Sequence, residues 1–150
     1  MILDATCAPS NIRYPQDFSL LNEAREKLEQ IIRRFHEDYG LALPRTYCRK
    51  ARKVYLNLAK SKRRSLSRIR KVIRYMLNCI HRDQDYLSGF MKDGFAPLFK
   101  EIGLMETIHK LYDQQLYMYE NKVHRVDDRI VSIEQPIHST NRKRQSEGTG

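Results

Sequence analysis

The stretch ILDATCAPSNIRYPQDFSLLNEAREKL, residues 2–28, decides the fold that the sequence predicts. It opens with a short apolar run that carries Asp4 at its end, passes through a proline-containing turn and enters a polar amphipathic helix. We therefore expect a strand over residues 1–7 and a loop over residues 8–17. A core strand of this kind can deliver a carboxylate to a metal site. No acidic group follows that could complete the site, so the chain is interpreted as a piece of an enzyme.

Helical spacing of apolar residues extends from this stretch along most of the chain. The first helix is expected from Ser19, with Asp17 or Ser19 as its cap and Gly40 as its stop. A second helix should follow Pro44, and residues 60–65 should separate it from the third. The predicted inner face of the first helix is Leu20, Leu21, Ala24, Leu28, Ile31, Ile32, Phe35 and Tyr39. That of the second helix is Tyr47, Ala51, Val54, Tyr55, Leu58 and Ala59. That of the third helix is Leu66, Ile69, Val72, Ile73, Met76, Ile80 and Leu87.

A fourth helix is expected from about Pro97 to Tyr119, with Gly103 as a point where it could bend. Its predicted inner face is Leu98, Ile102, Ile108, Leu111, Tyr112 and Tyr119. The run RIVSI, residues 129–133, predicts a short strand, and residues 137–150 have too little apolar content to order themselves. The predicted fold class is mainly α, with one short strand at each end and a disordered C-terminal tail. Two lone strands would need a sheet, because isolated strands are marginal in water.

Composition limits the class of protein. The chain has 150 residues, 31% of them charged, and a formal net charge of +10, which allows one domain and favours a polyanionic partner. No apolar run is long enough for a membrane span and no signal peptide is visible, so the expected compartment is the cytoplasm. Three widely spaced cysteines and five histidines without metal-ligand spacing argue against a disulfide framework or a zinc site.

Much of the positive charge lies in one long basic segment. Residues 41–82 contain no Asp or Glu, and tyrosines at positions 47, 55 and 75 are interleaved with the basic residues. An ordinary solvated helix face usually carries both signs of charge, so this pattern favours contact with a phosphate backbone without sequence reading. The predicted DNA-binding residues are Arg49, Lys50, Arg52, Lys53, Lys60, Lys62, Arg63, Arg64, Arg68, Arg70, Lys71 and Arg74.

Asp4 taken alone is a weak signal, because an aspartate at the end of a strand more often caps a turn. A site with two Mg²⁺ ions needs several converging carboxylates. The other acidic residues considered do not supply them: Asp83, Asp85, Asp113 and Glu120 have the periodicity of helix surfaces, and Asp127 and Asp128 have the setting of turn residues.

Four stretches of the chain together resemble a known family. They are LDATCAPSNIRYPQDFSLLNEAREKLE (residues 3–29), ARKVYLNLAKSKRRS (51–65), IHKLYDQQLYMYENK (108–122) and DRIVSIEQP (128–136). They resemble bacterial insertion-sequence transposases of the DDE type, in the group whose catalytic domain carries a helical insertion after its first strand. The resemblance covers nearly all of residues 2–136.

The resemblance implies an RNase H-like catalytic domain in which three acidic residues hold two Mg²⁺ ions. Asp4 matches the first of these catalytic and metal-binding residues, within the Asp-Ala-Thr motif, and residues 18–122 match the helical insertion. The second and third acidic residues are expected after the DRIVSI…QP motif, and a DNA-binding region is expected before Asp4; this sequence contains neither. Residues 1–136 are thus interpreted as a partial, catalytically inactive transposase domain, with Mg²⁺ a cofactor of the intact enzyme only. The implied partners are the DNA of element ends and intact transposase subunits, with no membrane.

The residues after Pro136 depart from the family pattern. Reading a back-translation of residues 137–150 one nucleotide later permits the family's continuation, so a frameshift near Pro136 is one hypothesis for this tail. Three interpretations stay open from sequence: a truncated transposase remnant, a small basic helical protein that binds nucleic acid and modulates an intact transposase, and one frame of a product of programmed frameshifting.

Overall fold

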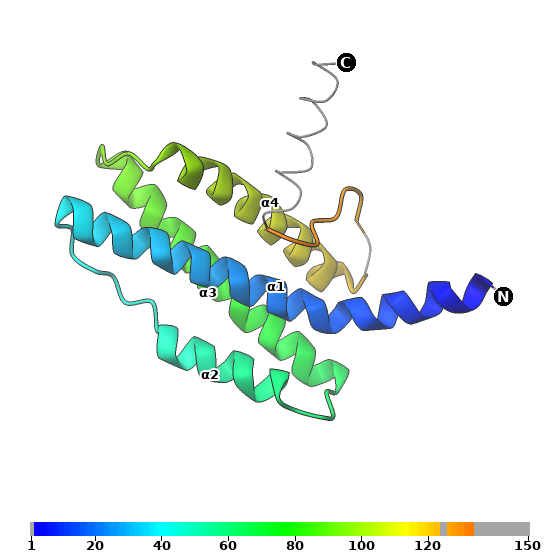
Figure 1. The fold of residues 1–150 in the computed structure, drawn as a ribbon. Helices are drawn as coiled ribbons and strands as arrows, with labels where there is room; N and C mark the ends of the chain where they lie inside the picture. Colours follow the sequence, from blue (N-terminus) through cyan, green and yellow to red (C-terminus); the bar gives the residue numbers. More distant parts are fainter. Residues whose placement is uncertain (1, 124–125, 134–150) are drawn as a thin grey trace, which may run out of the picture.

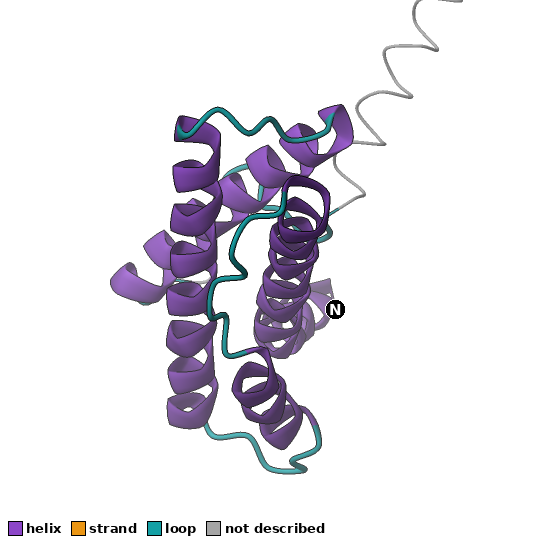
Figure 2. Cartoon of the chain, turned by 90° about the vertical axis from the view of Figure 1, so that its left-hand side faces the viewer, coloured by secondary structure: helices purple, strands orange, loops and turns teal. Residues whose placement is uncertain are grey.

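The computed structural model describes residues 2–123 and 126–133, with side chains from residue 17 onward. Four helices follow one another: α1 (Ile2–Tyr39), α2 (Cys48–Ala59), α3 (Leu66–Lys92) and α4 (Phe99–Asn121) (Figure 1). Figure 2 shows these helices joined by loops, and the described part of the chain contains no strand. The prediction of a mainly α fold is therefore confirmed.

The core lies between α1 and α3, which pack along one another at the centre of the molecule, while α2 and α4 lie on opposite sides of this pair (Figure 1). Each helix turns an apolar stripe toward the core because its apolar residues recur every three or four positions. The largest contributions come from Phe18, Leu21, Leu28, Ile32 and Phe35 of α1, Ile73, Met76, Ile80 and Leu87 of α3, and Ile108 and Leu111 of α4. Burying each such side chain contributes roughly 1.5–3 kcal/mol.

Two predicted helix boundaries agree with the structure. Gly40 follows α1 with φ 70°, and its N–H donates to the carbonyl of His36 over 3.0 Å. Glycine reaches this left-handed conformation without a steric penalty, which explains why the helix stops there. The expected break at residues 60–65 is also present, and the Ser65 hydroxyl accepts a hydrogen bond from the N–H of Arg68 at the start of α3.

The expected start of the chain is wrong: residues 2–17 belong to α1 instead of forming a strand and a loop. A strand leaves its backbone N–H and C=O groups unpaired unless another strand lies beside it, whereas a helix pairs them within itself. The described chain offers no neighbouring strand. Asp17 is consequently not a helix cap, and its carboxylate forms an ion pair with Arg129.

The expected strand over residues 129–133 is also wrong, and this segment is a loop fastened to α4. The Gln114 side chain accepts a hydrogen bond from the N–H of Ile130 and donates one to the carbonyl of Asp128, both over 2.9 Å. Ile130 and Ile133 are buried. A side-chain amide thus takes the place that a partner strand would have, and the RNase H-like setting expected for the helices is not seen in the described residues.

Five residues that the spacing predicts on inner faces are exposed in the structure. Their exposed fractions are 39% for Tyr39, 49% for Tyr47, 59% for Leu66, 44% for Leu98 and 41% for Ile102. Gly103 does not interrupt α4, which runs through it unbroken. The predicted tail, residues 137–150, lies outside the described residues. None of the described helices has the length and apolar character that crossing a membrane requires.

Candidate nucleic-acid interface

Helix α2 separates its apolar and basic residues onto two faces. Ala51 and Leu58, seven positions apart, are buried against the core. The four basic residues predicted to bind DNA on this helix, Arg49, Lys50, Arg52 and Lys53, are all exposed. Because 3.6 residues make one turn, Arg49, Arg52 and Lys53 lie on one side of the helix, and Lys50 lies beside them.

The connection between α2 and α3 carries further basic residues, and hydrogen bonds from arginine side chains hold its conformation. The Arg64 guanidinium donates to the carbonyls of Leu58 and Ala59, over 3.1 and 2.8 Å, and so satisfies the end of α2. Arg68 donates to the Ser61 hydroxyl over 2.8 Å. Lys60, Lys62 and Arg63 are exposed along this ordered turn.

Helix α3 extends the charge through Arg68, Lys71 and Arg74, which are exposed. Arg70 differs from them because it is half-buried. Its guanidinium donates to the carbonyl of Tyr119 over 3.0 Å and lies 4.2 Å from the centre of the Tyr119 ring. Arg70 therefore packs α3 against α4. The Arg64 guanidinium, which lies 5.7 Å from the centre of the Phe18 ring on α1, is likewise held against neighbouring helices.

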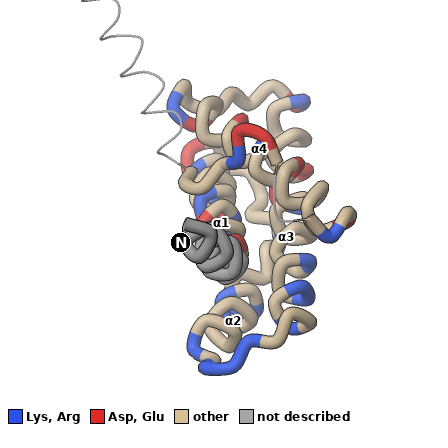
Figure 3. Tube along the Cα trace, turned by 90° about the vertical axis from the view of Figure 1, so that its right-hand side faces the viewer, with Lys and Arg blue, Asp and Glu red and all other residues tan. Residues whose placement is uncertain are grey.

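The remaining residues form what we call the basic surface, and Figure 3 shows it over α2, the following connection and the adjoining part of α3. Within the described part of the chain, none of its members forms an ion pair with an acidic side chain. Its members are Arg49, Lys50, Arg52, Lys53, Lys60, Lys62, Arg63, Arg64, Arg68, Lys71 and Arg74.

One of the three interleaved tyrosines lies at the edge of this surface. Tyr47, just before α2, is 49% exposed and has φ 54°, an uncommon conformation for a residue with a side chain. The Arg82 guanidinium holds it there, donating to the carbonyl of Thr46 over 2.8 Å and lying 5.2 Å from the Tyr47 ring centre. Tyr55 and Tyr75 are half-buried and pack against the core.

The predicted role of Asp4 as a metal ligand is not tested by the structure. Asp4 lies on α1, and its side chain is outside the described residues. Among the described residues, no three His, Cys, Asp or Glu side chains converge closely enough to hold a metal ion. The roles of Asp4 and Mg²⁺ therefore stay predictions from the family resemblance.

A buried polar cluster between α1 and α3 is the main feature that sequence reasoning missed. Asp83, expected on a surface, is fully buried, and neither of its carboxylate oxygens has a hydrogen-bond partner among the described residues. Its nearest cation is Arg82, whose Nε lies 3.9 Å from Oδ1, too far for a hydrogen bond. Loss of solvent raises the pKa of Asp83 to about 7, with a further contribution from the negative charge of Glu29. The sequence feature that indicates this burial is spacing: Asp83 lies three residues after Ile80 and four residues before Leu87, on the same face of the helix.

On the α1 side of the cluster, Arg25 is buried together with its partners. Its guanidinium donates to Glu29 over 2.5 Å and to the Asn22 amide oxygen over 2.8 Å. Burial raises the pKa of Glu29, and the neighbouring Arg25 opposes that shift. The cluster is a structural network in the core and lies apart from the basic surface.

No protein-family model, curated protein or solved structure matches this chain. Membership of the DDE transposases therefore stays a prediction from the sequence.

Proposed function

We propose that this chain binds nucleic acid through its basic surface, by contacts with the phosphate backbone and without reading base sequence. The observation that carries the proposal is the uninterrupted charge: the members of the surface are exposed, contiguous over two helices and unpaired with acidic groups in the described structure. Unpaired basic side chains release counterions from a polyanion when they neutralise its phosphates.

The size of the surface suits a duplex or a single strand. With a rise of 1.5 Å per residue, the 12 residues of α2 extend about 18 Å. Duplex DNA carries one charge per about 1.7 Å of axis, so several phosphates fall within reach of α2 and the following connection. Lysine and arginine side chains on long flexible stems can follow such a backbone, whereas base reading requires a few fixed contacts in a groove.

The helical core supports a binding role that does not depend on a sheet. Helices α1, α3 and α4 bury their apolar stripes against one another, so the basic surface is mounted on a core that these helices form together. The resemblance described above favours DNA as the nucleic acid and a transposase as the origin of the chain. In this proposal the chain contributes scaffold and DNA contact, and catalysis is not its own.

Salt-dependent affinity tests the binding proposal. Fluorescence anisotropy of labelled duplexes of two unrelated sequences should give equal affinities, falling linearly with salt on logarithmic axes. If four to six side chains contact phosphates, the slope should be about −4 to −5. Absence of binding at low salt, or a strong preference for one sequence, would contradict the proposal.

A matched pair of double variants locates the contact. Arg52→Gln with Lys53→Gln removes two charges from the basic surface and should reduce the magnitude of the slope by about 2. Lys92→Gln with Lys110→Gln removes the same charge from exposed positions elsewhere and should change the slope much less. Equal losses in the two variants would show that net charge, and not this surface, determines binding.

The absence of catalysis has a separate test. We expect no Mg²⁺-dependent nicking of DNA by the purified chain, because one carboxylate does not hold two Mg²⁺ ions. Nicking that is abolished by Asp4→Ala would show that the chain completes a catalytic site after all.

A further inference from the structure

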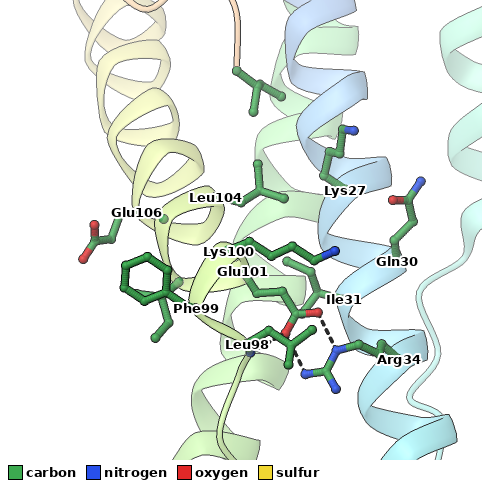
Figure 4. A pocket seen from close by; sticks show the side chains of 13 residues that line it. Lys27, Gln30, Ile31, Arg34, Leu98, Phe99, Lys100, Glu101, Leu104 and Glu106 are labelled. Carbon is green, nitrogen blue, oxygen red and sulfur yellow. Dashed lines mark hydrogen bonds and ion pairs between the residues drawn. The ribbon is translucent and has the colours of Figure 1, made fainter. Parts of the chain in front are cut away.

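A groove between α1 and α4 lies away from the basic surface and has a volume of about 880 Å³. Its floor includes Ile31 of α1, Leu104 of α4 and Ile133 of the following loop. The Arg34 guanidinium closes one end with two hydrogen bonds to Glu101, over 2.5 and 2.6 Å. Figure 4 shows this pair and the side chains around it.

The beginning of α4 exposes apolar residues beside the groove. Phe99 is 91% exposed, and Leu98 and Ile102 within one turn of it are 44% and 41% exposed. Single apolar residues on a surface are ordinary, but a cluster of them beside a hollow indicates an interaction site. Helix α4 already buries Ile108 and Leu111 on its inner face, so this outer apolar group is additional to the core.

The charges around the groove are arranged in a self-complementary way. In Figure 4, Phe99 and Glu106 project from the outer flank of α4, whereas Lys100 extends across the groove toward α1. Lys27 lies on the α1 side of the groove. The groove lining thus carries both signs of charge beside its apolar residues: Lys27, Arg34 and Lys100 are basic, and Glu101 and Glu106 are acidic.

We propose that the groove binds a second copy of this chain, in a two-fold symmetric dimer. Phe99 of each protomer enters the groove of its partner, and Glu106 of each meets the basic groups there. Such a contact is self-complementary, because one surface carries both the projection and the hollow, as a two-fold interface requires. The basic surface lies on the other side of α1 and α3, so both copies keep it open (Figure 1).

Sedimentation velocity of the full chain, without nucleic acid, tests the dimer independently of the proposed function. We expect a reversible monomer–dimer equilibrium in the micromolar range, as for small interfaces. Phe99→Ser should raise the dimer dissociation constant about thirtyfold, the effect of a central aromatic contact. Its matched control is Tyr117→Ser, which removes an exposed aromatic ring elsewhere on α4 and should leave the constant unchanged.

Charge reversal separates this interface from any other self-association. Glu106→Lys should weaken the dimer by placing like charges together, and adding Lys100→Glu should restore it. Circular dichroism should show native helicity in each variant, since these side chains are outside the core. A chain that stays monomeric at all concentrations, or a dimer that Phe99→Ser leaves intact, would overturn the proposal. The same holds if the charge-reversed double variant is weaker than Glu106→Lys alone.

Discussion

Replacing Asp83 by asparagine should abolish a specific pH dependence of stability. Asp83 is fully buried between α1 and α3, faces Arg25 and Glu29 from α1, and adjoins Arg82 on its own helix. Loss of solvent outweighs the attraction of the two arginines and raises the pKa of this carboxyl from 3.8 to about 7. The folded chain therefore binds the proton more tightly than the unfolded chain.

The sign and size of the effect follow from this difference. Between pH 4 and pH 7 the unfolded state has lost the proton that the folded state keeps, so the free energy of unfolding falls as the pH rises. A difference of about three pKa units corresponds to about 4 kcal/mol. The Asp83→Asn side chain stays neutral throughout, although its buried amide without partners costs about 1–3 kcal/mol. The variant should therefore be more stable than the wild type by about 1–3 kcal/mol at pH 8, and should lose that advantage by pH 4.

Urea unfolding followed by circular dichroism at several pH values measures this difference. Asp85→Asn is the matched control, because Asp85 lies two residues away on the same helix with its side chain 68% exposed. The control should keep the pH profile of the wild type. If the stability difference between wild type and Asp83→Asn stays constant within about 1 kcal/mol from pH 4 to pH 8, the reasoning about Asp83 is refuted.

Three further substitutions test the packing and the helix ends. Phe35→Ala should cost about 3–5 kcal/mol in urea unfolding, because the ring is fully buried and stacks on Phe90 with a centroid distance of 5.7 Å; a loss below about 1 kcal/mol would contradict the described core. Gln114→Ala should accelerate hydrogen exchange at the Ile130 amide and cost about 1 kcal/mol, since the amide loses its acceptor; unchanged exchange would mean that the loop is held in another way. Gly40→Ala should cost about 1 kcal/mol at φ 70°, and a gain in thermal stability would contradict the left-handed stop.

The helices could be predicted because their hydrogen bonds and side-chain spacing are local. The stripe from Leu20 to Phe35 and the stop at Gly40 both depend on residues within a few positions of one another. The strand predictions failed for the opposite reason. RIVSI has the composition of a strand, but a strand also needs a partner, and here the Gln114 side chain supplies the hydrogen bonds.

The basic surface could be predicted from the sequence, because basic residues on the polar face of an amphipathic helix stay exposed to solvent. The exception is Arg70, whose burial depends on where Tyr119 lies. Tyr119 is 49 residues away in the sequence, so no local pattern predicts this contact. Charged residues are usually exposed, so the sequence predicts a surface position for Asp83, although Asp83 lies within the apolar stripe of α3. The groove beside Phe99 arises from the packing of α1 against α4, which no spacing within either helix specifies.

Folding and the proposed nucleic-acid binding depend on different residues, and this makes the competing interpretations distinguishable. The core side chains face inward from α1, α3 and α4, whereas the basic surface occupies the outer faces of α2 and α3. Substitutions such as Arg52→Gln should therefore change stability by no more than about 0.5 kcal/mol. A loss of affinity in such a variant can then be assigned to the missing phosphate contact. An inert remnant would show native helicity without salt-dependent binding, and a binding protein would show both.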